Sequence, residues 1–211
     1  MNLTLVTPQL PEARSGNWIT AARYKRILRH LGHRVELTTD YDGEDSDALI
    51  ALHARRSHAS IRRWADTRRG KPLVVVLTGT DLYRDIHQDA SAQASLDMAS
   101  RLVVLQRMGV TELPEPHRGK TRVIYQSVTD CHAGQAKPPS THFNVAVLGH
   151  LRPEKDPLRT ALAARLLPEA SRIRVAHAGA ALDEALGDEA KKESAANPRY
   201  RWLGGIPHWR A

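Results

Sequence analysis

The sequence predicts an α/β protein with two successive domains, each built on a parallel sheet. Short apolar runs typical of β-strands alternate with segments whose apolar residues recur every three to four positions, as in helices. The strand-like runs are continuously rich in Val, Leu and Ile, as a parallel sheet buried on both faces requires. One turn-rich stretch interrupts the alternation, which then starts again. These observations indicate two successive α/β domains.

The first domain is predicted to span residues 1–135. Its strands are predicted at Leu3–Val6, Val35–Thr38, Ala48–Leu52, Leu73–Leu77, Leu102–Leu105 and Arg122–Tyr125. Helical periodicity lies between most of them and is clearest from Trp18 to Leu31, where Gly32 is placed to end the helix. This order of elements predicts a doubly wound sheet.

Residues 136–142 are predicted to form a linker, because the stretch around them is turn-rich and contains no strand. The second domain, residues 143–211, is predicted to have strands at Phe143–Leu148, Arg172–Ala176 and Tyr200–Leu203 and helices at Pro157–Leu167 and Ala181–Ala196. So few strands leave open sheet edges and only part of a core. We therefore expect this domain to be incomplete in this chain and prone to association.

Composition limits the environment and the chemistry. The chain has 211 residues and one cysteine, Cys131, which excludes an intrachain disulfide and a Cys-based zinc site. The longest apolar run, Leu73–Leu77, is far shorter than the roughly 20 residues that cross a bilayer, and the first residues lack the features of a signal peptide. We therefore expect a cytoplasmic protein with no membrane partner. The histidines show no ligand spacing, so no metal and no cofactor is predicted.

The formal net charge of +8 raises a nucleic-acid hypothesis. The densest basic stretch runs from Arg55 to Arg69, but it follows a helical pattern with Ile61 and Trp64 and lacks the interleaved aromatics of single-strand binders. A solvated helix face explains this stretch better than a nucleic-acid patch. Small-molecule substrates are therefore the predicted partners, no nucleic acid is expected, and the sequence leaves the oligomeric state open.

Ligands of open α/β sheets bind beyond the carboxyl ends of the strands, so the loops after the strands hold the candidate residues. The loop after the first strand contains Ser15, Gly16 and Asn17, of which Asn17 can cap a helix that starts at Trp18. The N–H groups of that helix start, with the Thr20 hydroxyl, could bind an anion. An anion site and a simple capped turn both fit this loop.

Basic and hydroxyl side chains follow two further strands of the first domain. His53 and Arg55 come directly after Ala48–Leu52, and an Arg fork beside an imidazole can hold a tetrahedral oxyanion. Thr80 and Asp81 follow Leu73–Leu77, where they can cap a helix or orient a substrate. Of these two roles, capping is favoured.

The second domain offers a cationic loop after its first strand. That loop contains Gly149, His150, Arg152 and Lys155. Arg152 and Lys155 lie three residues apart, just before a helix that Pro157 can start. Together with the positive N-terminus of that helix, the two cations could bind a diphosphate and stabilise it as a leaving group.

The stretch Gly149-His150-Leu151-Arg152-Pro153-Glu154-Lys155-Asp156-Pro157 resembles the opening of the donor domain in two-domain, Rossmann-like glycosyltransferases of the B fold. Further segments point to one subgroup: Ser15-Gly16-Asn17, Ala51-Leu52-His53-Ala54-Arg55-Arg56-Ser57, Leu77-Thr78-Gly79-Thr80-Asp81-Leu82-Tyr83, Val104-Leu105-Gln106 and Val123-Ile124-Tyr125-Gln126-Ser127. With these segments, nearly the whole chain resembles the selenosugar synthases of selenoneine biosynthesis.

This resemblance implies an enzyme that joins selenophosphate to the sugar of a UDP-sugar, such as UDP-N-acetylglucosamine or UDP-glucose. The products would be a selenosugar, UDP and phosphate. The resemblance also implies a Gly-rich acidic segment whose glutamates hold the donor, and the sequence does not reach it before Ala211. We therefore expect those glutamates to lie beyond Ala211 and the 211 residues alone not to form a competent enzyme.

Under this resemblance, Arg152 and Lys155 are the catalytic residues, because they would neutralise the charge that develops on UDP. Asn17 and Thr20 would contact the donor sugar or its diphosphate, and His53 with Arg55 would hold the phosphate end of selenophosphate. The substrate-binding set is completed by Ser15, Gly16, Thr80, Asp81, Gly149 and His150. Selenium is a soft, anionic nucleophile, so a strong protein base is not needed.

Two other functions fit the sequence. A conventional glycosyltransferase with a hydroxyl acceptor would need a catalytic base. A basic nucleotide-binding or nucleic-acid-binding module without enzymatic activity would draw on the net charge of +8.

Overall fold

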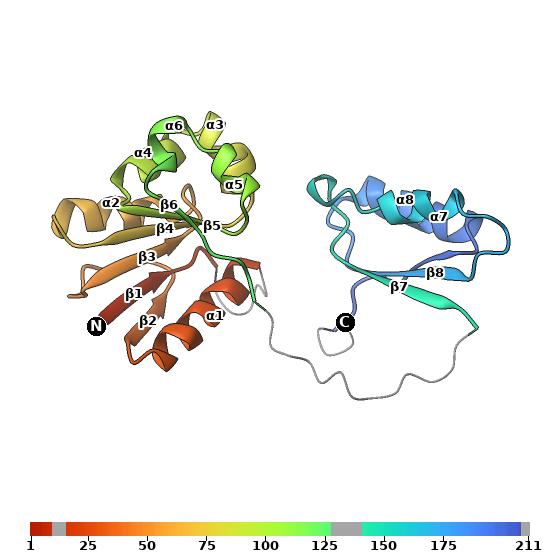
Figure 1. Cartoon of the computed structure of the whole chain (residues 1–211), viewed down its shortest axis with the longest axis horizontal. Coiled ribbons are helices and arrows are strands. Elements are labelled where there is room, and N and C mark those ends of the chain that lie inside the picture. The colour runs from red at the N-terminus through yellow and green to blue at the C-terminus, as the bar shows by residue number, and fades with distance from the viewer. Residues whose placement is uncertain (10–15, 128–140, 208–211) are drawn as a thin grey trace. The chain divides into compact units, whose positions relative to one another are not determined.

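The computed structural model describes residues 1–9, 16–127 and 141–207. The chain divides into two compact units, Met1–Cys131 and His132–Ala211, each with a parallel sheet (Figure 1). The predicted α/β class is confirmed. Ser15 and most of the predicted linker lie outside the described residues. Among the residues that are described, no helix is long and apolar enough to span a bilayer.

The first unit is built on a sheet of six parallel strands. They are β1 (Asn2–Val6), β2 (Arg34–Thr38), β3 (Ala48–Leu52), β4 (Leu73–Leu77), β5 (Arg101–Val104) and β6 (Thr121–Val123). Their order is β2-β1-β3-β4-β5-β6, so the strand order reverses between β1 and β3. In open sheets, the crevice at such a reversal, beyond the carboxyl ends of the strands, is the usual ligand site.

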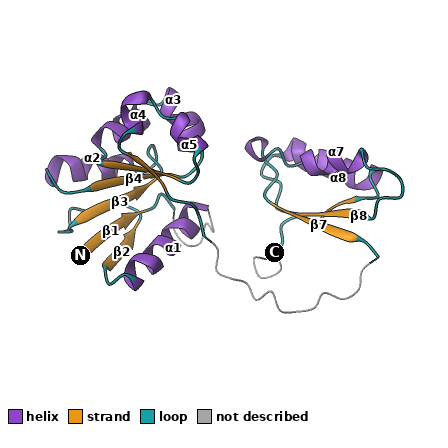
Figure 2. Ribbon diagram, in the orientation of Figure 1, coloured by secondary structure: helices purple, strands orange, loops and turns teal. Residues whose placement is uncertain are grey.

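Helices cover both faces of this sheet (Figure 2). They are α1 (Gly16–His30), α2 (His58–Thr67), α3 (Ile86–Gln88), α4 (Ala90–Met98), α5 (Met108–Thr111) and α6 (Glu115–Arg118). Ala21 of α1 belongs to the core on one face with Leu5, and Trp64 of α2 belongs to the core on the other face with Val75. Burial on both faces explains why the strands are continuously apolar.

The second unit is a smaller sheet with helices on one face (Figure 2). Its strands β7 (Phe143–Leu148), β8 (Ile173–Ala178) and β9 (Tyr200–Trp202) are parallel and pair in sequence order. Its helices are α7 (Arg159–Arg165) and α8 (Glu184–Ala196). Ala161 of α7 packs with Val175 and Tyr200 in a small apolar core.

Three predicted helix starts are wrong by two or three residues: α1, α7 and α8 begin at Gly16, Arg159 and Glu184 instead of Trp18, Pro157 and Ala181. α1 begins at Gly16, so Asn17 lies within its first turn and does not cap a helix at Trp18. In the second unit, a 3-10 turn forms at Pro153–Lys155 and Asp156 adopts a left-handed conformation with φ 44°. A left-handed residue cannot continue a right-handed helix, so the 3-10 turn ends at Asp156. The helix α7 begins separately at Arg159, and Pro157 precedes it.

Candidate functional site

The candidate residues after β3 and β4 lie together at the carboxyl edge of the first sheet. These strands are parallel neighbours with Leu52 opposite Val76, so the loops that follow them are adjacent. His53 Nε2 lies 3.2 Å from Thr80 Oγ1, which joins the two loops directly. The parallel register therefore brings together residues that are 27 positions apart in the sequence.

The His53 ring is neutral and fixed. Its backbone is left-handed, with φ 73°, and the residue is only 2% exposed. The Arg56 amide donates to Nδ1 at 3.3 Å, so the ring proton is on Nε2 and is donated to Thr80 Oγ1. Burial lowers the pKa of His53; Arg56 and Arg55 act in the same direction, while Asp81 and Asp85 oppose them. At this position His53 is a neutral hydrogen-bond donor rather than a cation.

The lowered pKa of His53 predicts a loss of stability in acid. As pH falls below about 6.5, the unfolded chain binds the His53 proton before the folded chain does, so the free energy of unfolding decreases by up to about 1.4 kcal/mol per pH unit. His53→Asn removes this titration, and Asn tolerates a positive φ. We expect urea unfolding at pH 7, 6 and 5, followed by circular dichroism, to show a steeper decline for the parent than for His53→Asn. Parallel declines would contradict a neutral, buried His53.

The Asp81 carboxylate braces the two loops from inside. It is 0% exposed, and its Oδ1 accepts hydrogen bonds from the amides of Thr78 at 3.0 Å and Gly79 at 2.9 Å. Its Oδ2 accepts from the Ala54 amide at 3.0 Å. Asp81 therefore shapes both loops through their backbones, and its direct contact with a substrate stays a prediction.

A second buried carboxylate, Asp85, is shared by two arginines. Its Oδ2 accepts from Arg55 Nε at 2.8 Å and its Oδ1 accepts from Arg84 Nε at 3.1 Å. Burial acts to raise the pKa of Asp85, but the hydrogen bonds from Arg55 and Arg84 outweigh it and hold the pKa below its usual value. The sequence analysis identified Arg55 but missed Arg84 and Asp85, whose pairing could not be inferred from spacing.

The first-loop residues are tied to the opposite edge of the sheet. The Thr20 hydroxyl donates to the Gly16 carbonyl at 2.8 Å and accepts from Gln126 Nε2 at 2.9 Å. Gln126 follows β6 and also accepts a hydrogen bond from Arg23 of α1. Thr20 is therefore buried in a polar network at the start of α1, and contact of Asn17 and Thr20 with a donor sugar stays a prediction.

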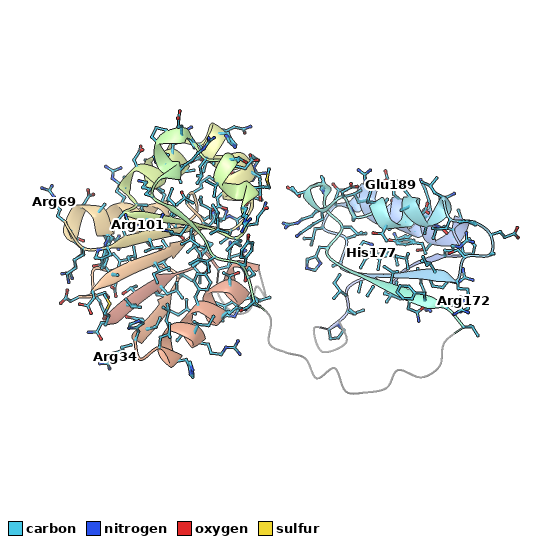
Figure 3. All side chains as sticks on the ribbon, in the orientation of Figure 1. Arg34, Arg69, Arg101, Arg172, His177 and Glu189 are labelled. Atoms are coloured by element: carbon cyan, nitrogen blue, oxygen red, sulfur yellow. The ribbon has the colours of Figure 1, made fainter. Side chains whose placement is uncertain are left out.

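In the second unit, His177 braces the loop after β7. Figure 3 shows His177 among the side chains between the sheet and its helices. Its Nε2–H donates to the Gly149 carbonyl at 3.0 Å, and its Nδ1 accepts from the Tyr200 hydroxyl at 2.9 Å. Burial raises the pKa of Tyr200 to about 12, so the phenol remains a donor at neutral pH. A Cβ at Gly179 would lie 1.8 Å from the Gly149 oxygen, so only glycine allows this close packing.

The loop after β7 also carries two cations, Arg152 and Lys155. His150 Nδ1 accepts from the Ala180 amide at 3.0 Å, which holds the loop against the residues after β8. Arg152 is half-buried with an extended backbone, and Lys155 is exposed at the end of the 3-10 turn. Neither side chain forms a hydrogen bond or ion pair with the described part of the chain. Both cations are therefore available to an anionic ligand.

The acidic loop between β2 and β3 is bound by basic side chains. Arg63 donates to the Tyr41 carbonyl at 2.7 Å, Arg68 donates to the Gly43 carbonyl at 2.7 Å, and Asp45 pairs with Arg68 and Lys71. Part of the basic stretch therefore holds this loop in place.

Within residues 1–9, 16–127 and 141–207, no group of three or more His, Cys, Asp or Glu side chains could hold a metal ion.

A cleft of about 500 Å³ lies away from these loops. It is lined by Asn2 and Leu3, by Arg34–Leu37, by Lys25 and Arg29, and by residues 44–46. These residues place it at the amino ends of β1 and β2. Ligands of open parallel sheets bind at the opposite ends of the strands, which in the first unit is where the loops that carry His53 and Thr80 lie.

The two parallel sheets and their helices have the Rossmann-like fold of glycosyltransferases of the B class. Similar solved structures are those of HepE from Anabaena. The structure of HepE in complex with UDP shares 14% sequence identity with this chain and has a TM-score of 0.57. The match covers 97% of this chain and 69% of HepE. In complex with UDP-glucose, it is 18% identical with a TM-score of 0.57, over 98% and 69%. In complex with UDP and glucose, the identity is again 18%, over 97% and 69%, with a TM-score of 0.57.

At these identities the similarity to HepE defines the fold. No protein-family model matches the chain, and no curated protein matches it in sequence. These similarities therefore assign no role to any individual residue of the chain.

Proposed function

We propose that this protein is a UDP-sugar-dependent glycosyltransferase whose acceptor is a phosphate-type anion, selenophosphate, so that its product is a selenosugar. The donor class is supported by the fold that the chain shares with HepE, which was solved with UDP and with UDP-glucose. The acceptor class is supported by the charge of the loops after β3 and β4 and by the sequence resemblance to selenosugar synthases.

The donor role belongs to the loop after β7. Arg152 and Lys155 lie on a loop that the Gly149 and His150 contacts hold in place, and both cations are without a partner among the described residues. Breaking the sugar–diphosphate bond leaves negative charge on UDP, which nearby cations stabilise. In this proposal Arg152 and Lys155 bind the diphosphate and stabilise its departure.

The acceptor role rests mainly on the charge at the carboxyl edge of the first sheet. Asp85 is the partner of both Arg55 and Arg84, while Arg56 is exposed and has no side-chain hydrogen bond or ion pair within the described residues. Together with Asp81, these loops hold two carboxylates against three arginines, so one positive charge is in excess, and the neutral His53 removes none of it. A hydroxyl acceptor has no charge to balance this surplus, whereas a phosphate-type anion does.

The proposed reaction balances without an added oxidant or reductant. The selenium of selenophosphate attacks the anomeric carbon, a C–Se bond forms, and the bond from that carbon to the diphosphate oxygen breaks with its electron pair going to UDP. Water then cleaves the Se–P bond, which releases phosphate and leaves the selenosugar. The protein's part is to position two anions and to stabilise the leaving group.

The cytoplasmic location stays a prediction.

The test is to incubate the full-length protein with UDP-glucose or UDP-N-acetylglucosamine and either selenophosphate or a panel of alcohols. We expect mass spectrometry to find a selenosugar and UDP only where selenophosphate is present. Arg55→Ala should lose activity with selenophosphate. Its matched control is Arg62→Ala, which removes the same charge from the exposed face of α2. Transfer to alcohols without transfer to selenophosphate would identify a conventional glycosyltransferase and contradict the proposal.

A further inference from the structure

We propose that Arg84, together with Arg55, forms a two-arginine clamp for a tetrahedral dianion, and that Asp85 is the positioning residue that holds both guanidinium groups. The inference rests on the proposed function for the identity of the acceptor, but the clamp itself is defined by contacts within the first unit.

The charges at this place do not cancel. Asp85 is the one carboxylate that pairs with Arg55 and Arg84 within the described residues, and one carboxylate balances only one guanidinium. Asp81, the other buried carboxylate, keeps its negative charge although three neutral backbone amides bind it, and Arg56 adds a third positive charge at these loops. The three arginines therefore exceed the two carboxylates by one positive charge, which is suited to an incoming anion.

Each arginine contacts Asp85 through Nε alone. The contacts are 2.8 Å for Arg55 and 3.1 Å for Arg84, and they go to different oxygens of the same carboxylate. The terminal nitrogens of both arginines form no hydrogen bond with the rest of the described chain. Each guanidinium thus keeps terminal N–H donors that can bind a phosphate oxygen, and bidentate arginine contacts suit that geometry.

The Asp85 side chain is much less exposed than the two arginine side chains that it binds. The Asp85 side chain is 6% exposed, whereas the Arg55 and Arg84 side chains are 38% and 53% exposed. Leu82 and Ile86, on either side of the arginine and its carboxylate in the sequence, are each 2% exposed and belong to the core. These apolar anchors fix the π-helical turn Asp81–Asp85, so Asp85 presents both arginines from a rigid base.

The test is calorimetric titration of the full chain with inorganic phosphate, for the parent, Arg84→Ala, Asp85→Asn and Arg62→Ala. We expect Arg84→Ala to weaken phosphate binding about tenfold, as the loss of a charge-assisted hydrogen bond does. Arg62→Ala removes the same charge from the exposed face of α2 and should leave the dissociation constant within twofold of the parent.

Asp85→Asn distinguishes positioning from net charge. Removing a negative charge should tighten phosphate binding if only the overall charge matters, whereas losing the holder of both guanidinium groups should weaken it about tenfold. Tighter binding by Asp85→Asn, or unchanged binding by Arg84→Ala, would overturn the clamp. If Asp85→Asn does not fold, Arg84→Ala decides alone, because its side chain is exposed and its removal leaves the core intact.

Failure of the clamp and failure of the proposed function give different results. Phosphate binding that depends on Arg84, in a protein that does not transfer sugar to selenophosphate, would support the clamp and contradict the proposed acceptor. Sugar transfer to selenophosphate that is unaffected by Arg84→Ala would support the proposed function and overturn the clamp.

Discussion

Lys155→Ala is expected to lower the turnover of UDP-sugar by roughly 30- to 900-fold, which corresponds to about 2–4 kcal/mol of transition-state stabilisation. The lysine is exposed and has no hydrogen bond or ion pair with the described residues, so its removal leaves the fold unchanged. The charge that it would neutralise develops as the diphosphate leaves. The loss should therefore fall on kcat more than on KM.

Lys192→Ala is the matched control for this experiment. Lys192 is also exposed, but it lies near the carboxyl end of α8, away from the loop after β7. Steady-state kinetics with a UDP-sugar and selenophosphate should leave Lys192→Ala near the parent rate. A rate within threefold of the parent for Lys155→Ala would remove that residue from the reaction.

Asp81→Ala is expected to destabilise the first unit by about 3–5 kcal/mol. Its carboxylate accepts hydrogen bonds from the amides of Thr78, Gly79 and Ala54 in a place that is 0% exposed. Alanine leaves the buried Ala54 N–H and the part-buried N–H groups of Thr78 and Gly79 without this acceptor. An unsatisfied buried donor costs about 1–3 kcal/mol, and the three losses are less than additive. The loops after β3 and β4 would also lose their shared anchor.

Urea unfolding measures this effect, with Asp66→Ala as the control because Asp66 is exposed on α2 and its side chain is 70% exposed. The control should shift the free energy of unfolding by no more than about 0.5 kcal/mol. Asp81→Asn should be intermediate, because the amide oxygen can still accept from Thr78 and Gly79 while its NH₂ group opposes the Ala54 amide. An Asp81→Ala loss below 1 kcal/mol would show that the brace is dispensable.

Much of the fold could be predicted from the sequence because strands that are buried on both faces have a recognisable pattern of residues. A strand covered on both faces must be apolar at every position, and the runs at Ala48–Leu52 and Leu73–Leu77 coincide with β3 and β4. Helix starts were harder, because they depend on single backbone conformations. The residue before a proline is biased away from the right-handed helical region, and Asp156 is left-handed, but this bias does not determine that α7 begins at Arg159.

The candidate site was predicted in part. The rule that ligands bind beyond the carboxyl ends of parallel strands led to His53, Arg55, Thr80 and Asp81, and the structure places the loops that carry them side by side. It did not lead to Arg84, which lies within the π-helical turn Asp81–Asp85, a form with no clear sequence signature. The sequence placed the His53 imidazole beside an arginine as part of an oxyanion site, but it could not show that burial keeps the ring neutral.

The sequence by itself determined the class of fold and the residue types at the ends of the strands, because both follow from local patterns of apolar and polar side chains. Only the tertiary structure determined which charged side chains form ion pairs with one another. Arg55 and Asp85 are 30 positions apart, and they pair because β3 and β4 are neighbours in a parallel register. The same packing determines whether a charged or ionisable group is a brace or a ligand contact: Asp81 and His53 are buried and bound by neighbours, whereas Arg152 and Lys155 remain unpaired among the described residues. Burial and hydrogen-bond satisfaction are properties of the folded chain, so residue identity alone could not assign these roles.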